Sequence, residues 1–138
     1  MSLVDYSALE GEISGAQEPK TLKAGEEVKA RIIKINSGIS AKNDCKWFSV
    51  VFDVEDDPMI KEFSDFFWEL DREKLDAKSY SRSLYQFQQF AAAFGLDYSR
   101  PFSWEDDMPG LSGWVIVGVK KSDEYGEQNT VKKYIAGN

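Results

Sequence analysis

The spacing of apolar residues changes along this 138-residue chain from an alternating pattern to a helical one and back. Alternation predicts strands, because successive side chains of a strand point to opposite faces. From Ser79 to Phe94 apolar residues recur every three or four positions, which predicts one amphipathic helix that ends at Gly95. Three strands are predicted before the helix and two after it, at residues 27–36, 46–55, 60–70, 113–121 and 129–137.

This order is that of a five-stranded OB-fold barrel, an all-β fold with one helix between strands 3 and 4. Residues 27–138 are predicted to form the barrel, and residues 1–26, which are polar and lack a sustained period, an N-terminal arm or lead-in. The adjacent Ile32 and Ile33 interrupt the alternation of the first strand and predict a bulge. The facing of the third strand stays ambiguous, because Phe66, Phe67 and Trp68 are consecutive.

The helix is expected to bury an aromatic stripe that contains Phe87, Phe90 and Phe94. Leu84 and Ala91 share that stripe, and a serine near the start of the helix is the predicted N-cap.

Composition excludes several classes of protein. The chain lacks histidine and has a single cysteine, Cys45, so an internal disulfide, a zinc site and a His-dependent nucleophile are not expected. The acidic runs at residues 55–57 and 105–107 are interpreted as solvated loops, with a metal-dependent nuclease as a distant third functional class. We therefore expect no enzyme, no catalytic residue, no metal and no cofactor. With no long apolar run and no secretory leader, the chain is expected to be cytoplasmic and to have no membrane contact.

Charge and aromatic content point to a binding function. The net charge is −7, but residues 28–50 hold five basic residues against one acidic residue, whereas residues 51–76 hold ten acidic residues against three basic ones. The aromatic share of 14% exceeds the need of a small core. Some rings are therefore expected on the surface, where rings interleaved with cations suit a flexible nucleic-acid strand.

OB barrels usually bind ligands across strands 2 and 3, between the loop after strand 1 and the loop after strand 4. Among the candidates, Trp47 has rim packing as its alternative role, and Trp114 has that of covering the barrel end. The lysine pairs at residues 120–121 and 132–133 have the alternative of solvated strand ends, and Tyr125 that of a local packing residue. The candidate nucleic-acid-binding residues are Lys29, Arg31, Lys46, Trp47, Trp114, Lys120, Tyr125, Lys132 and Tyr134.

The C-terminal half carries a series of short motifs: Ala93-Phe94-Gly95 at the helix end, Leu111-Ser112-Gly113 at a strand start, and Tyr125-Gly126, Asn129 and Val131-Lys132 in the last hairpin. This series resembles the phage-type OB-fold single-stranded DNA-binding proteins, which are encoded beside replication and recombination genes. The resemblance implies a bacteriophage protein in the cytoplasm of a bacterial host. The glycines and Asn129 of these motifs are interpreted as residues that serve turn geometry. Many family members end in an acidic tail that recruits partners, whereas this sequence ends in Lys-Lys-Tyr-Ile-Ala-Gly-Asn. We therefore expect this ending to leave strand binding intact but not to supply partner recruitment.

Two functional hypotheses follow. The first is sequence-independent binding of single-stranded DNA, which would protect or organise that DNA during phage replication or recombination. The alternative is an acidic OB-fold interaction module that docks through residues 51–76 on a basic replication or recombination protein. The expected partners are accordingly single-stranded DNA and replication or recombination proteins, and the sequence leaves open whether the chain is a monomer or a homodimer.

Overall fold

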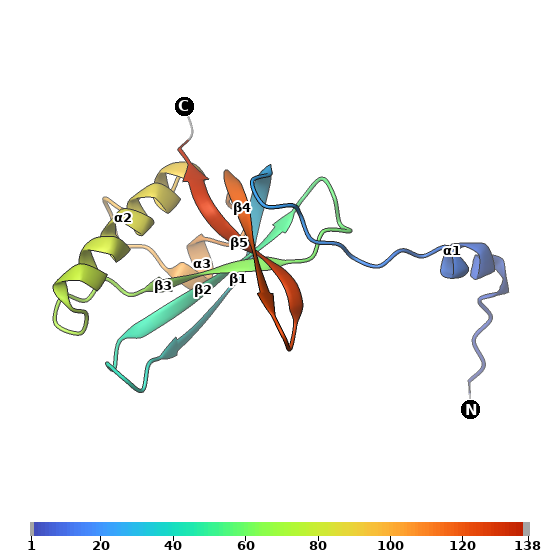
Figure 1. The fold of residues 1–138 in the computed structure, drawn as a ribbon, viewed down its shortest axis with the longest axis horizontal. Helices are drawn as coiled ribbons and strands as arrows, with labels where there is room; N and C mark the ends of the chain where they lie inside the picture. The colour runs from blue at the N-terminus through green and yellow to red at the C-terminus, as the bar shows by residue number, and fades with distance from the viewer. Residues whose placement is uncertain (1, 137–138) are drawn as a thin grey trace.

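Five antiparallel strands and one long helix make up most of the structure, a computed structural model that describes residues 2–136 (Figure 1). The order along the sheet is β3-β2-β1-β4-β5. The predicted β-rich class with a helix between the third and fourth strands is thus confirmed. The elements are a 3-10 turn at Ser7–Leu9, α1 at Glu10–Ser14, β1 at Glu27–Ile39, β2 at Lys46–Val54, β3 at Phe63–Trp68, α2 at Ala77–Phe94, α3 at Trp104–Asp107, β4 at Ser112–Ser122 and β5 at Gly126–Ile135.

The long strand β1 organises the sheet, because it pairs with β2 over residues 30–39 and with β4 over residues 27–31. Within the described residues no backbone ladder joins the two edge strands, β3 and β5, so the sheet is not closed by main-chain pairing. Side chains link the edges instead: the hydroxyl of Tyr134 on β5 donates to the carboxylate of Asp65 on β3 over 2.5 Å.

Alternation sets the faces of the strands as predicted for β2, where Phe48, Val50 and Phe52 are buried. The predicted bulge in β1 is confirmed by a register shift between Ile32 and Lys34. The strand limits differ by up to three residues at the hairpins: β1 continues to Ile39, and β5 begins at Gly126. Pairing of β4 with β5 persists up to the turn, which therefore occupies only residues 123–125. Residues 137 and 138, which the predicted domain includes, lie outside the described residues.

Helix α2 covers one end of the sheet with its aromatic stripe. Phe87, Phe90 and Phe94 are buried, as predicted, whereas Leu84 is 41% exposed. The predicted serine N-cap is wrong: Asp76 caps the helix, and its carboxylate accepts a hydrogen bond from the Ser79 backbone N–H over 2.7 Å. Aspartate suits this position because its side chain reaches the free amides of the first turn.

Two glycines fix how α2 meets the sheet. Gly95 ends the helix in the left-handed region, with φ +69°, as predicted. Gly113 lies within β4 and not in a turn, so its predicted role in turn geometry is wrong. A Cβ atom at Gly113 would lie 2.5 Å from the backbone carbonyl oxygen of Ala93, so only glycine lets the helix approach the strand this closely.

The residues before β1 fall into two parts. Residues 20–26 lie against the sheet: Lys20 pairs with Ile60, and Leu22 is buried in the core. The Asn129 side chain on β5 accepts a hydrogen bond from the Leu22 N–H and donates one to the Leu22 carbonyl. Asn129 is thus a buried clamp, and its predicted role in a turn is wrong. Residues 2–19, here called the arm, carry α1 and project away from the sheet (Figure 1).

Among the residues described, no helix is both long enough and apolar enough to cross a membrane.

Candidate nucleic-acid interface

Three aromatic side chains meet on the outer face of β2 and β3. Trp47 on β2 is the register partner of Trp68 on β3, and Phe66 lies two positions before Trp68. The rings of Trp47 and Phe66 stack with their centroids 5.8 Å apart, and the Phe66 and Trp68 rings meet edge to face at 4.9 Å. Phe66 is 46% exposed and both tryptophans are partly exposed. We call Trp47, Phe66 and Trp68 the aromatic platform.

The backbone of β1 supports the platform from below. A Cβ atom at Gly38 would lie 2.6 Å from the indole of Trp47, its register partner, so the indole lies directly over this glycine. Trp47 is held in place by β1 on one side and by Phe66 on the other. A ring fixed in this way loses little conformational freedom when a ligand stacks on it.

Polar side chains extend the outer face away from the platform. The register aligns Asn36 of β1 with Ser49 of β2, and Lys34 of β1 with Val51. Lys34 and Asn36 are exposed. Along the outer face, the aromatic rings are therefore followed by the polar pair Asn36 and Ser49 and then by Lys34.

Arg31 stands beyond Lys34 on this face, but its charge is already engaged. Its guanidinium makes a bidentate ion pair with Asp53, with N–O distances of 3.1 and 2.7 Å, and lies 3.5 Å from Glu55. The hydrogen bond to Asp53 raises the pKa of Arg31 above its ordinary value. The prediction of Arg31 as a free phosphate contact is therefore not supported by its surroundings.

Lys46 and Tyr134 are corrections to the predicted site. Lys46 alternates with Trp47 and so faces the other way, and its Nζ lies 5.2 Å from the ring centroid of Phe48, a core residue. Tyr134 is only 6% exposed, and its ring packs against Phe90, with centroids 5.5 Å apart. Neither side chain reaches the platform face.

Burial shifts the pKa of both Tyr134 and Asp65. Desolvation raises the pKa of Tyr134 well above its usual value, and the adjacent carboxylate adds to that effect. Desolvation also raises the pKa of Asp65, although hydrogen bonds from Tyr134, Gln86 and the Phe66 N–H oppose the rise. The pair therefore connects β3 to β5, and its buried groups do not face a ligand site.

A second group of predicted residues lies toward the other end of β1. Trp114 of β4 is 47% exposed and faces Lys29 of β1 across the ladder. Lys132 sits in a bulge of β5, where the register shifts, and is exposed. Lys29 and Gly38 are nine positions apart in β1, which is roughly 30 Å along a strand that rises about 3.3 Å per residue. The structure thus does not bring Trp114 and Trp47 into one cluster.

The tip of the β4–β5 hairpin carries the last two predicted residues. Tyr125 is 65% exposed, and Lys120 is exposed in the adjoining strand. The neighbouring Lys121 pairs with Glu127 over 3.6 Å. This hairpin and the β1–β2 hairpin project from the same side of the body (Figure 1).

Phe66 and Trp68 are the residues that sequence reasoning missed. They could have been found from Phe63 and Phe67, because both of these side chains are buried in the core and so determine which residues of β3 face inward. Two inward residues four positions apart leave Phe66 and Trp68 outside.

In the part of the chain that the structure describes, no group of three or more acidic or cysteine side chains converges. Cys45 is buried, and desolvation raises the pKa of its thiol. The acidic run at residues 105–107 has a local use: Ser103 accepts a hydrogen bond from the Asp106 N–H, and its own N–H donates to Asp107 at the start of α3. Residues 105–107 thus belong to α3, so their prediction as a loop is wrong, and the Asp107 carboxylate takes part in capping this helix.

Comparison with known protein families and with curated proteins finds no match to this chain.

Proposed function

We propose that this protein binds single-stranded DNA without sequence preference, on the outer face of β2 and β3. The observation that carries the proposal is the aromatic platform. Phe66 packs against both Trp47 and Trp68, and all three rings stay partly exposed although the core of the chain already holds Phe52, Phe67 and Phe90, so burial in the core does not explain them. Such rings are useful when bases stack on them, at about 1–3 kcal/mol per base.

The surroundings of the platform favour an unpaired strand as its ligand. Bases of a duplex are stacked on each other and offer no free ring face, whereas bases of a single strand do. Lys34 and Asn36 continue the face beside the rings and supply a cation and hydrogen-bonding groups for the sugar-phosphate backbone. The net charge of −7 opposes indiscriminate attraction to duplex DNA.

We further propose that the sheet is an OB-type barrel whose edges are joined by side chains. Three features support this: β1 pairs with both β2 and β4, α2 connects β3 to β4, and Tyr134 bridges to Asp65 between the edge strands. In such a barrel the β1–β2 and β4–β5 hairpins flank a ligand that lies across β2 and β3. Tyr125, at the tip of one hairpin, then has a role in closing over the strand.

A role in phage replication or recombination belongs to the same proposal and rests on the resemblance of the C-terminal motifs. The alternative, docking of residues 51–76 on a basic protein, has less support. Several of its acidic side chains already have partners within the chain: Asp53 pairs with Arg31, Asp57 with Lys20 and Asp71 with Lys74.

The test is a titration with oligo-dT at low salt, followed by tryptophan fluorescence and by the anisotropy of labelled DNA. We expect quenching, and we expect Trp68→Ala and Phe66→Ala each to weaken binding about 5- to 150-fold, which corresponds to the loss of 1–3 kcal/mol of stacking. The matched control is Tyr85→Ala, which removes an exposed ring from α2 (65% exposed) and should leave the affinity unchanged. Unchanged anisotropy with the parent protein, or equal affinities for all three variants, would refute the proposal.

A further inference from the structure

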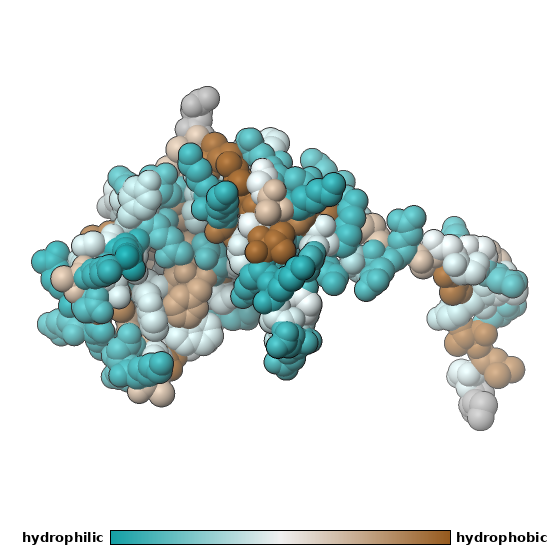
Figure 2. Space-filling view, in the orientation of Figure 1, coloured by the Kyte–Doolittle hydropathy of each residue, from teal (hydrophilic) through white to brown (hydrophobic). Residues whose placement is uncertain are grey.

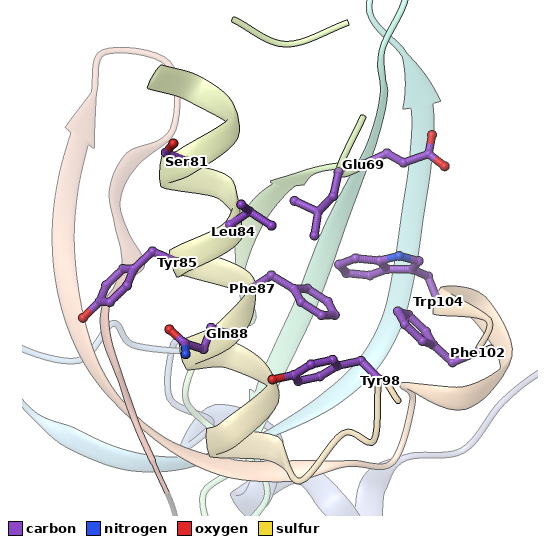
Figure 3. A pocket seen from close by; sticks show the side chains of 10 residues that line it. Glu69, Ser81, Leu84, Tyr85, Phe87, Gln88, Tyr98, Phe102 and Trp104 are labelled. Carbon is purple, nitrogen blue, oxygen red and sulfur yellow. The ribbon is translucent and has the colours of Figure 1, made fainter. Parts of the chain in front are cut away.

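An apolar groove of about 750 Å³ lies along the side of α2 (Figure 3). Figure 3 shows side chains from α2, from the loop after it and from α3 converging on this space. Leu84 is 41% and Tyr98 57% exposed. The apolar side chains that line the groove are Leu70, Leu84, Phe87, Tyr98, Phe102 and Trp104.

The arm presents apolar side chains that no other described residue covers. Leu3, Val4, Leu9 and Ile13 are 92%, 69%, 42% and 56% exposed, and α1 buries none of its residues. Figure 2 shows brown, apolar atoms on the projecting arm. The short helix and its flanks thus form an apolar surface without a partner, on a segment held away from the body.

We propose that the arm of one copy of this chain docks in the α2 groove of a second copy, so that two chains exchange arms. Each copy supplies one arm and one groove, and a two-fold arrangement satisfies both at once. This inference goes beyond DNA binding and does not depend on it, since neither the arm nor the groove includes a platform residue.

Charge complementarity supports this occupant. Residues 2–19 hold four acidic residues and no basic ones. Helix α2 has no acidic residue, and its Lys78 and Arg82 form a stripe with Tyr85, because positions i, i+4 and i+7 share one face of a helix. Tyr85 borders the groove, so the two cations lie on the α2 face next to it, outside the described lining, in which Glu69 is the one charged side chain. No ion pair within the described residues engages either cation.

Reach decides between the groove of the same chain and that of a second copy. Between α1 and the anchor at Lys20 lie five residues, which span at most about 17 Å. A body of the size of residues 20–136 has a radius of gyration of about 13 Å, or a diameter of about 35 Å if spherical. In Figure 1 the arm leaves the body on the side opposite α2. With α1 intact, Leu9 and Ile13 cannot reach their own groove.

Sedimentation of the full chain over about 1–100 µM tests the proposal. The parent should dimerise, and a Leu9→Asp, Ile13→Asp arm variant should weaken dimerisation at least tenfold. So should the groove variant Leu84→Asp, whose new charge lies in an apolar site facing an acidic arm. The matched control is Ala92→Asp, which adds the same charge at an exposed position of α2 outside the groove lining.

Mixing distinguishes arm exchange from damage to the fold. The arm variant keeps an intact groove and the groove variant an intact arm, so a one-to-one mixture should recover a dimer that neither forms alone. A labelled peptide of residues 2–16 should bind the arm variant and not the Leu84→Asp variant. A parent that stays monomeric up to 100 µM, a dimer that Leu84→Asp leaves intact, or a mixture without heterodimer would overturn the proposal.

Discussion

Replacement of Tyr134 by Phe tests whether this residue links β3 to β5 or contacts a ligand. The ring is buried against Phe90 and Phe94, and phenylalanine preserves that packing. Only the hydroxyl is lost, and with it the 2.5 Å hydrogen bond to Asp65. The variant therefore isolates one interaction between the two edge strands.

The expected cost follows from what remains around Asp65. A hydrogen bond to a charged group contributes about 1.5–3 kcal/mol. Asp65 keeps two other donors, the Gln86 amide at 3.2 Å and the Phe66 N–H at 3.0 Å. We therefore expect the lower part of that range, about 1.5–2 kcal/mol at pH 7. For a domain of this size this lowers Tm by about 6–8 °C.

The cost should depend on pH. Burial raises the folded-state pKa of Asp65, and the hydrogen bond from Tyr134 opposes that rise. Losing the hydroxyl raises the folded-state pKa further, so the folded variant holds its proton to a higher pH than the parent does. The variant should then be penalised more at pH 7, where the carboxyl must ionise in a less favourable site, than near pH 4.

Thermal and urea unfolding at pH 4 and pH 7, with an oligo-dT titration of the same samples, measures both roles. Tyr98→Phe, which removes a hydroxyl from an exposed tyrosine, is the control. The reasoning predicts lower stability and unchanged DNA affinity for the Tyr134 variant. Unchanged stability with weakened binding would mean that Tyr134 contacts the ligand, and the assignment of a structural role would be wrong.

Three further changes test the fold. Asp65→Asn removes a carboxyl group whose pKa is raised in the folded state, so the parent loses stability as pH rises from about 4 through that pKa. The variant lacks this loss, and urea titrations should therefore show its unfolding free energy, minus that of the parent, growing more positive over this range. Gly113→Ala forces a Cβ atom against the α2 backbone and should cost about 1–3 kcal/mol by urea unfolding, whereas Gly11→Ala, with open space around it, should not destabilise. Asn129→Ala removes both hydrogen bonds to Leu22 and should speed hydrogen exchange and proteolysis of residues 20–26, and unchanged protection there would contradict the clamp.

Periodicity was sufficient to predict the five strands and α2, because each of them has a buried face with its own repeat. The short helices α1 and α3 were not predicted, because they bury none of their residues. The bulge at Ile32 and Ile33 was visible because two adjacent isoleucines cannot both obey alternation. The cap at Asp76 was not, because several polar residues near the helix start can accept the same hydrogen bond and periodicity does not rank them.

The site was harder to predict because one inserted residue reverses the facing of all that follow it. In β5 the register shifts between Val131 and Lys133, and Lys132 is the extra residue. Strict alternation from Asn129 would send Tyr134 outward; the bulge turns it into the core. No local sequence signal marks this bulge, whereas in β3 the outward facing of Phe66 and Trp68 follows once Phe63 and Phe67 are known to be buried.

The surroundings of the basic side chains determine how strongly DNA binding should depend on salt. Arg31 is neutralised by Asp53, and Lys46 faces away, so Lys34 is the described cation on the outer face of β1 that lies closest in register to the platform. Each phosphate contact to a single strand contributes about 0.7 to the magnitude of the slope of log K against log salt. One or two contacts give a slope between about −0.7 and −1.4, and Lys34→Ala should reduce its magnitude by about 0.7. Affinity for oligo-dT measured from 50 to 300 mM salt gives this slope directly. A slope steeper than about −3 would show that charge, rather than stacking on the aromatic platform, dominates the interaction, and the site would then have to be sought around Lys29 and Lys132.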